Sequence, residues 1–422
     1  MQHAATPLPF PALQALQNGT RSYRRPPNSS AQPRWSYLQG YLPRWAKNYR
    51  ATPPLYDELV PFDQFPRQIT GPTVWKAEDY RENPEKWTHT FNEEQVAELS
   101  AAADAFLASK TPLTGISKSN FQLPKLAEYL HKLRADLIDG KGFILFKGFP
   151  VQKWGNHKSA VAYMGLGTYL GYFVSQNSRG HVLGHVKDLG EDSTQIDKVR
   201  IYRTNARQYF HADDSDIVGL LCIAKALEGG ESDLVSSHNV YNTLAAERPD
   251  VLKTLISPIW YFDRKGETST GQEEFIRTSV IYLERSAAET GIEPRVYTKW
   301  DPYYVRSLGR FSDAGIIPPL SAEQLEALKV LEETCVRLSL HMVLDIGDIQ
   351  FLSNAHILHA RTAYTDHAPP KPRRHLMRLW LATPEEEGGW RLPFWDSNEK
   401  KRGVSRLMIR RLSRLWMLSS LG

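Results

Sequence analysis

The chain has 422 residues, of which 41% are hydrophobic and 23% charged, and a chain of this size and composition folds around a substantial buried core. Its formal net charge of +5 arises in a short C-terminal segment, because seven Lys and Arg residues lie between positions 400 and 414. A nucleic-acid-binding protein is expected to spread basic residues over a folded face, so this charge distribution argues against that class of function.

Residues 1–90 are predicted to form an N-terminal arm rich in proline and aromatic residues, and residues 1–66 of it are expected to be irregular. Residues 1–66 hold 11 of the 27 prolines, and proline fixes φ and removes a backbone donor, which disfavours regular helix or sheet. The same segment carries large aromatic side chains, and packing them on a domain surface is favourable because it removes apolar area from water. These aromatic residues are Trp35, Tyr37, Tyr41, Trp45, Tyr49 and Tyr56.

Two amphipathic helices and a strand are predicted after the arm. The first helix begins behind Asn92, a residue type that caps helix N-termini, and has apolar residues at helical spacing over 96–106. The second helix runs over 126–140. The glycine-bounded run at 142–149 is short and rich in aromatic residues, which indicates a buried strand.

The remainder of the chain is mainly β-like, with helices between the strands. Strand-like runs occur over 201–237 and again over 347–383. Helices are predicted at 237–247 and from Ser321, where the Ser-x-x-Gln pattern resembles a capping box. This order of elements indicates an antiparallel β domain with flanking helices.

The strongest chemical signal is His211-Ala212-Asp213 together with a histidine far downstream, His359. Residues i and i+2 of a strand point to the same side, so His211 and Asp213 can bind one ion while His359 arrives from another strand. Two imidazoles and one carboxylate suit ferrous iron and leave positions open for co-substrate and dioxygen. Spacing alone is weak evidence, because a chance His-x-Asp is common in a chain with 13 histidines.

A basic residue after the last histidine strengthens this interpretation. Arg374 follows His359 by 15 residues, on a predicted neighbouring strand, and a guanidinium binds a carboxylate bidentately. This fits 2-oxoglutarate, whose C1 carboxylate and C2 ketone chelate iron while its C5 carboxylate needs a cation and a hydroxyl partner. Ser232, after the Gly229-Gly230 turn, is the candidate hydroxyl.

These segments resemble the taurine dioxygenase (TauD/TfdA) and clavaminate synthase-like iron(II)/2-oxoglutarate dioxygenases. The matching stretches are GFILFKGFP, SQNSRGHVLGHVKD, YFHADDSDIVGLLCIAKALEGGESDLVSS, and NAHILHARTAYTD followed by RRHLMRLWL. The resemblance implies a mainly β fold with flanking helices around a double-stranded β-helix (jelly-roll, cupin-like) core. The dioxygenase domain is expected at 91–395, with an insert at about 240–340.

The resemblance also implies an activity and a set of site residues. The expected enzyme uses Fe(II), 2-oxoglutarate and O2 to oxidise an unactivated C–H bond of a small molecule in secondary metabolism, giving succinate and CO2. Hydroxylation, desaturation and oxidative cyclisation are all compatible outcomes. The implied residues are His211, Asp213 and His359 as catalytic metal ligands, Ser232 and Arg374 on 2-oxoglutarate, and Arg378 near the substrate.

Strand alternation places Arg374 and Arg378 on one face of the last strand. Two arginines on one face of an apolar strand need anionic partners. We therefore assign Arg374 to 2-oxoglutarate and Arg378 to a substrate carboxylate, which makes the expected partner an anionic small molecule such as an amino acid. A structural salt bridge from Arg378 to an Asp or Glu is the alternative.

Three further residues are possible substrate contacts by their position alone. For each of them, core packing or hydrogen bonding within a loop is at least as plausible an explanation. They are Asn177, Tyr209 and Phe210.

Other histidines offer competing interpretations. His356 precedes His359 by three residues, but His359 carries the Leu-His-Ala-Arg context of the resembled family, so we favour His359 as the ligand. His181 and His185 have the spacing of a zinc-protease helix, yet the segment lacks the catalytic Glu and would place Gly184 inside the helix. A zinc hydrolase is therefore disfavoured.

Glycines at 165, 167 and 171 imitate a dinucleotide-binding loop. Their spacing is GxGxxxG and no parallel βα unit surrounds them. Close packing of a helix explains these glycines better.

The C-terminal tail at 396–422 repeats basic and apolar residues. It fits a basic amphipathic helix that contacts an anionic membrane or a partner, or one that packs on the protein's own surface.

Two isolated cysteines, Cys222 and Cys335, match no disulfide framework. With no apolar run near the roughly 18 residues that span a bilayer, we expect a cytoplasmic protein without a membrane span, of undetermined oligomeric state.

A non-catalytic metal-binding scaffold of the same fold is the competing class of function. Such a protein would use the arm and the basic tail as interaction surfaces. Loss of one of the three ligand residues would favour it, and His211, Asp213 and His359 are all present.

Overall fold

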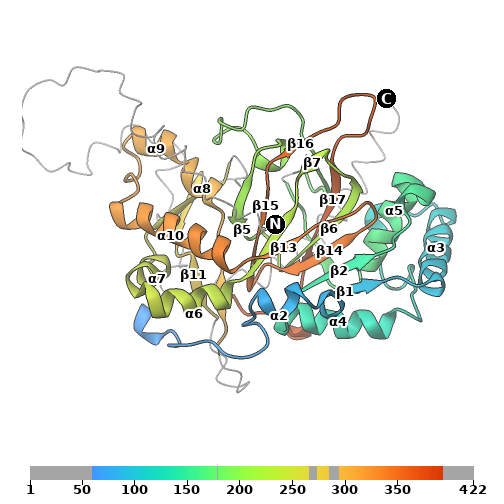
Figure 1. The fold of residues 1–422 in the computed structure, drawn as a ribbon, viewed down its shortest axis with the longest axis horizontal. Helices are drawn as coiled ribbons and strands as arrows, with labels where there is room; N and C mark the ends of the chain where they lie inside the picture. The colour runs from blue at the N-terminus through green and yellow to red at the C-terminus, as the bar shows by residue number, and fades with distance from the viewer. Residues whose placement is uncertain (1–58, 178, 266–272, 285–293, 393–422) are drawn as a thin grey trace, which may run out of the picture. The chain divides into compact units, whose positions relative to one another are not determined.

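The computed structural model describes residues 59–177, 179–265, 273–284 and 294–392. The aromatic residues of the arm at 35–56, which are predicted to pack on a domain surface, and the basic tail from 396 lie outside these ranges. Within them, the fold is built on one large and one small β-sheet, with helices on their outer faces (Figure 1).

The large sheet has the strand order β1-β2-β14-β6-β17-β3, and β4 also pairs with β17. Only the pairing of β1 with β2 is parallel; the other pairings in this sheet are antiparallel. The strands are β1 Thr88–Thr90, β2 Phe143–Lys147, β3 Tyr172–Phe173, β4 Leu183–Val186, β6 Ile217–Ala224, β14 Ile349–Ser353 and β17 His375–Ala382.

The small sheet has the order β13-β8-β15-β5 and is antiparallel throughout. Apolar side chains of both sheets meet in one buried cluster, with Val218 and Leu352 from the large sheet and Leu234 and Ile357 from the small one. The two sheets face each other, and the chain passes repeatedly between them, from β5 to β6 to β8 and from β13 to β14 to β15 to β17. This is the topology of a double-stranded β-helix, so the predicted fold class is confirmed. The strands are β5 Gln208–His211, β8 Ser232–Ser236, β13 Leu340–Met342 and β15 Ile357–Arg361.

Three helices cover the outer face of the large sheet. Asn92 and Gln95 form the reciprocal side-chain and backbone hydrogen bonds of a capping box at the start of the first helix. The apolar stripe of this helix is buried at Leu99, Ala103 and Phe106, so its prediction from periodicity is confirmed. The helices are α3 Glu93–Ala108, α4 Ala127–Asp139 and α5 Val151–Gly167.

A second group of elements covers the outer face of the small sheet and lies between β8 and β13 in the chain. Ser321 and Gln324 form the predicted capping box before the longest of its helices. The elements of this group are α6 Ser237–Glu247, α7 Pro249–Ile256, β9 Trp260–Asp263, β10 Phe275–Thr278, β11 Ile281–Leu283, β12 Val296–Thr298, α8 Pro302–Arg306, α9 Gly309–Asp313 and α10 Ala322–Leu338.

No helix in the described ranges is both long and apolar enough to cross a bilayer.

Residues 59–90 pack on the two-sheet core. Trp75 and Trp87 are buried in the same apolar cluster as Phe143 of β2, although this segment has little regular structure. The domain boundaries expected at 90 and 395 remain predictions. The remaining elements are α2 Glu78–Arg81, β7 Glu228–Gly229, β16 Tyr364–Thr365 and the 3-10 helices Phe62–Gln64, Pro84–Lys86, Leu113–Gly115, Ile201–Arg203 and Glu385–Glu387.

Glycines of α5 allow close approach of the helix to its neighbours. A Cβ atom on Gly165 would lie 2.3 Å from the ring of Phe121, and one on Gly167 would lie 3.0 Å from Leu379 Cδ1. Both glycines are buried. The dinucleotide-loop interpretation therefore does not apply to them, and helix packing explains their positions.

We expect Gly165→Ala to lower the free energy of unfolding by about 1–3 kcal/mol, because the added methyl overpacks a filled core. Urea denaturation measures this change. The matched control is Gly309→Ala at the start of α9, where an added Cβ meets nothing within 4 Å. A Gly165→Ala protein as stable as the control would contradict the packing argument.

Candidate active site

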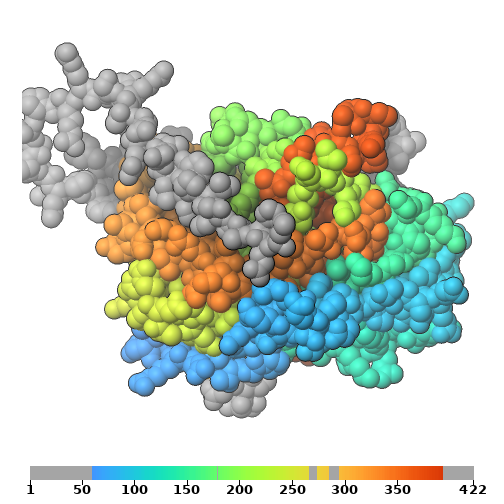
Figure 2. Space-filling model, viewed as in Figure 1, coloured from blue at the N-terminus to red at the C-terminus, as the bar shows by residue number. Residues whose placement is uncertain are grey.

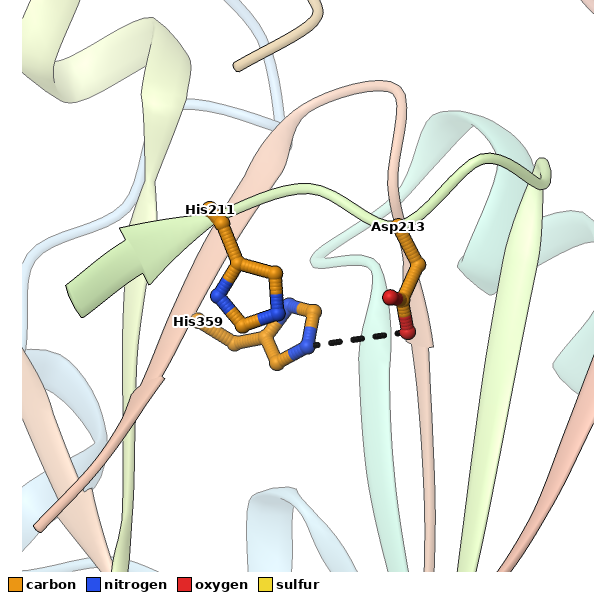
Figure 3. Close-up of side chains that lie close together, drawn as sticks. All are labelled: His211, Asp213 and His359. Carbon is orange, nitrogen blue, oxygen red and sulfur yellow. Dashed lines mark ion pairs between the residues drawn. The ribbon is translucent and has the colours of Figure 1, made fainter. Parts of the chain in front are cut away.

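Three predicted ligand residues converge between the two sheets. His211 ends β5, Asp213 follows it by two residues, and His359 lies in the middle of β15 directly opposite His211 in the strand register. One ligand atom from each residue lies within 4.8 Å of the other two, and all three side chains are buried. His359 Nε2 is 3.9 Å from Asp213 Oδ2 (Figure 3).

The hydrogen bonds of His211 prepare its ring for a cation. Its Nδ1 lies 2.9 Å from the carbonyl oxygen of Tyr209, which can only accept, so Nδ1 carries the proton and Nε2 keeps its lone pair. The side-chain amide of Gln208 donates to that lone pair at 2.9 Å. Sequence reasoning did not identify Gln208, since no spacing rule links residues three apart in a strand.

The charge states also suit a divalent metal. Burial lowers the pKa of His359 to about 3, so the imidazole is neutral, and its Nδ1 has no hydrogen-bond partner in the described chain. Burial alone would raise the pKa of Asp213, but the charge of the Arg378 guanidinium opposes this effect, and the pKa of Asp213 lies below its usual value. The neutral imidazole of His359, the unprotonated Nε2 of His211 and the ionised carboxylate of Asp213 form a donor set that fits ferrous iron.

The loop that carries Asp213 is held from two directions. The Asp213 backbone N–H donates to Asn354 Oδ1 at 3.0 Å, and the Asn354 amide donates to Ser215 Oγ at 3.1 Å. The backbone N–H of Ala212 donates to the carbonyl of Trp300 at 2.7 Å. The segment between β8 and β13 therefore helps to fix the position of a ligand.

Arg378 of β17 contacts this ligand directly. Its Nη1 lies 3.3 Å from Asp213 Oδ1, and its Nε donates to Gln176 Oε1 at 2.8 Å. The guanidinium also lies against the rings of Tyr202 and Trp380, 4.8 and 4.6 Å from their centroids. The salt bridge expected as the alternative for Arg378 is thus present here, while a contact with substrate stays a prediction.

Arg374 and Ser232 lie on a small cavity beside the ligands. Arg374 is buried, its Nη2 donates to the carbonyl of Gly230 at 2.9 Å, and its Nη1 has no partner in the described chain. Gly230 has φ +79°, and a Cβ there would lie 2.5 Å from Arg374 Nε. The glycine turn therefore gives the guanidinium its place, and Ser232 Oγ accepts from Gln350 Nε2 at 3.2 Å.

A larger cavity of about 320 Å³ adjoins Asp213 and Arg378. Arg378 lines both cavities and thus stands at their junction. Figure 2 shows a hollow on one face of the molecule beside the yellow-green segment at β7, which directly precedes Gly230 and Ser232 of the small cavity. Among the residues that line the larger cavity are Gln176, Arg200, Lys265, Asp301, Tyr303 and Tyr304.

The three weaker substrate candidates lie elsewhere. Asn177 Oδ1 accepts from the backbone of Arg179 at 3.0 Å within its own turn. Tyr209 packs against the ring of Tyr303, with a centroid distance of 5.9 Å, and Phe210 is buried in the apolar cluster under the small sheet. None of the three lines either cavity, so core packing and loop hydrogen bonding, the alternatives from sequence, describe their positions.

The competing histidines are separate from the ligand cluster. His356 is buried, lies 3.2 Å from the carbonyl of Ile138 through Nε2, and stacks on Trp390. His185 lies in strand β4 and not in a helix. The helical zinc motif therefore does not form.

Comparisons with known proteins agree with this geometry. A family model described as "Taurine catabolism dioxygenase TauD, TfdA family" matches residues 109–380. The chain is 32% identical over 333 residues to a taurine hydroxylase-like protein, SAT17, of Stachybotrys chartarum, covering 77% of this chain and 82% of that protein. It is 28% identical over 323 residues to FR-33289 synthase of Streptomyces rubellomurinus, covering 75% and 90%.

Solved structures share the fold. An asparagine oxygenase in complex with Fe(II), 3-hydroxyasparagine and succinate aligns with a TM-score of 0.52 at 15% identity, over 70% of this chain and 94% of that one. The non-haem iron oxygenase OrfP, in complex with Fe and alpha-ketoglutaric acid, aligns with a TM-score of 0.51 at 14% identity, over the same shares. Both alignments confirm the jelly-roll architecture.

We expect His359→Ala to abolish binding of Fe(II), because an open three-ligand site has no spare donor. His356→Ala should keep one Fe(II) per chain and instead lose about 2–5 kcal/mol of stability, because it leaves a cavity in the core. Anaerobic equilibrium dialysis and urea denaturation measure the two properties. The exposed His131→Ala is the control. Loss of iron in His356→Ala with retention in His359→Ala would reverse our assignment.

Proposed function

The chain belongs to the TauD/TfdA family and is an iron(II)- and 2-oxoglutarate-dependent dioxygenase, and we propose that it oxidises an unactivated C–H bond of a small amino acid or other carboxylate. The observation that carries this proposal is the buried cluster of His211, Asp213 and His359, which two cavities adjoin. The proposal covers hydroxylation, desaturation and ring closure as outcomes of that oxidation.

The metal and 2-oxoglutarate, when bound, supply oxidation of a C–H bond coupled to conversion of 2-oxoglutarate and O2 into succinate and CO2. His211, Asp213 and His359 would hold the metal. The backbone carbonyl of Tyr209 keeps His211 in the binding tautomer, and Asn354 keeps the Asp213 loop in place. The chain's contribution is thus to orient the donors and to exclude water.

Arg374 and Ser232 are proposed to bind the C5 carboxylate of 2-oxoglutarate. The support is that the Arg374 guanidinium is buried with a free N–H donor and forms no ion pair with a carboxylate among the described residues, and that Ser232 lines the same cavity. Burial lowers the pKa of Arg374, although a guanidinium stays protonated near neutral pH. A carboxylate ligand would compensate this buried charge.

The larger cavity is proposed to bind the substrate. Arg378 stands at its inner end, where it can bind a substrate acid group once the metal shares the charge of Asp213. Asp301 lines the same cavity and accepts one hydrogen bond, from the backbone of Tyr303 at 2.8 Å, which leaves acceptor capacity for a substrate amine. The family description names taurine, a molecule with an amine and an acid group, which supports this substrate class.

A cytoplasmic location is also part of the proposal. The scaffold alternative is disfavoured because all three ligand residues are present and converge.

Addition of candidate amino acids and carboxylates to anaerobic protein with Fe(II) and 2-oxoglutarate tests the function, since substrate binding shifts the metal-to-ligand absorption band. A protein that binds no Fe(II) and forms no succinate would overturn the proposal.

We expect Arg374→Ala to raise the 2-oxoglutarate concentration for half-maximal succinate formation by roughly 10- to 150-fold. This is the loss of affinity that corresponds to removal of one charge-assisted hydrogen bond. Arg378→Ala should raise it far less. Lys371→Ala is the matched control, because Lys371 is an exposed cation three residues away. An equal rise in Arg374→Ala and Arg378→Ala would contradict the assignment of the two arginines.

Arg378→Ala should uncouple the reaction. Slow succinate formation without substrate should persist, while oxidation of the substrate identified by the absorption screen should nearly disappear, because a misplaced C–H bond is out of reach. Parallel measurement of 2-oxoglutarate consumption, substrate oxidation and Fe(II) binding checks this. If Arg378→Ala also loses Fe(II) binding, Arg378 acts only by holding Asp213. If the unchanged enzyme oxidises the methyl ester of its substrate as well as the free acid, Arg378 does not bind an acid group of the substrate.

A further inference from the structure

A second buried arginine lies beside Arg374. Arg361 of β15 follows the ligand His359 by two residues, so both side chains point to the same side of the strand. Arg361 is 6% exposed and lines the small cavity. Its Nη2 donates to the backbone carbonyls of Thr204, at 3.2 Å, and Ala206. Its Nε and Nη1 have no partner in the described chain.

Arg361 and Arg374 lie against the same aromatic ring. Their guanidinium carbons are 4.9 and 5.0 Å from the ring centroid of Tyr364, whose hydroxyl also has no partner within the described ranges. No carboxylate of the described chain lies within ion-pair distance of either arginine. Aromatic contact compensates a buried cation only in part, so this pair of charges requires an anion.

The strand register places this anion relative to the metal ligands. His359 lies opposite Leu234, and Arg361 lies opposite Ser232, so Arg361 and Ser232 share one end of the β15–β8 pair. Two residues of a strand span about 6.8 Å. The four C–C bonds of 2-oxoglutarate, at about 1.5 Å each, put C5 about 5 Å from C1. A diacid held by C1 at the metal therefore presents C5 to Arg361 and Ser232.

We propose that Arg361 is a second guanidinium ligand of the C5 carboxylate, acting with Arg374 to make the small cavity selective for a 2-oxo dicarboxylate over a 2-oxo monocarboxylate. This inference rests on the proposed function and deepens it. Arg361 is neither one of the three proposed metal ligands nor one of the two residues that the sequence assigned to 2-oxoglutarate.

Arg361→Gln and Arg361→Met test the proposal. Binding of 2-oxoglutarate and of 2-oxovalerate, which has five carbons but no C5 carboxylate, is measured by calorimetry on anaerobic Fe(II)-loaded protein. We expect both variants to bind 2-oxoglutarate about 10- to 150-fold more weakly and 2-oxovalerate as well as the unchanged protein does. A purely structural role at the Thr204 and Ala206 carbonyls would weaken both acids alike, which would overturn the proposal.

Arg374→Gln serves as the reference for the proposed function. Weaker binding of 2-oxoglutarate in Arg374→Gln but in neither Arg361 variant would overturn the inference and leave the co-substrate site intact. Unchanged binding in all three variants would overturn the co-substrate site itself. Met keeps an apolar stem of similar length where the amide of Gln is poorly tolerated, and a folded Arg361→Met protein that binds 2-oxoglutarate as before would by itself refute the proposal.

Discussion

The antiparallel pairing of β15 with β5 on one side and β8 on the other is the constraint on which the rest of the site depends. It sets His359 opposite His211 and, two residues on, Arg361 opposite Ser232. A slip of β15 by one residue would turn His359 and Arg361 to the opposite face, away from His211 and Ser232. The apolar residues that alternate with them, Leu358 and Ala360, fix the register because they are buried in the cluster under the small sheet.

Buried charge is the second theme of the site. Arg361 and Arg374 lie in the jelly-roll interior without an ion-pair partner among the described residues, and Arg378 pairs only with Asp213, itself a proposed metal ligand. Unpaired buried charge costs stability. The chain tolerates it because rigid neighbours hold the guanidinium groups, as the Gly230 carbonyl does for Arg374. Metal, co-substrate and substrate would each compensate part of this charge, so their binding is energetically linked to the stability of the folded protein.

The segment between β8 and β13 has two roles. Through α6, α7 and α10 it covers the small sheet, and through Trp300 it holds the backbone beside Asp213. The same segment supplies Asp301, Tyr303 and Tyr304 to the larger cavity. A sequence change in this segment therefore alters the larger cavity, which we propose as the substrate site, without altering the strands that carry the proposed metal ligands.

The sequence by itself indicated an antiparallel β domain and the capped helices, because hydrophobic period and capping boxes are local signals. Its resemblance to a known family implied the double-stranded β-helix and the three proposed metal ligands, whose side chains lie together in the structure. It also separated His359 from His356 through the residues around each. The tertiary structure alone decided what each side chain contacts. Only strand pairing brings Asp213 to Arg378 and Arg361 to Ser232, and only the loop conformation turns Asn177 away and brings its neighbour Gln176 to Arg378. These contacts join residues distant in sequence, and no local pattern encodes them.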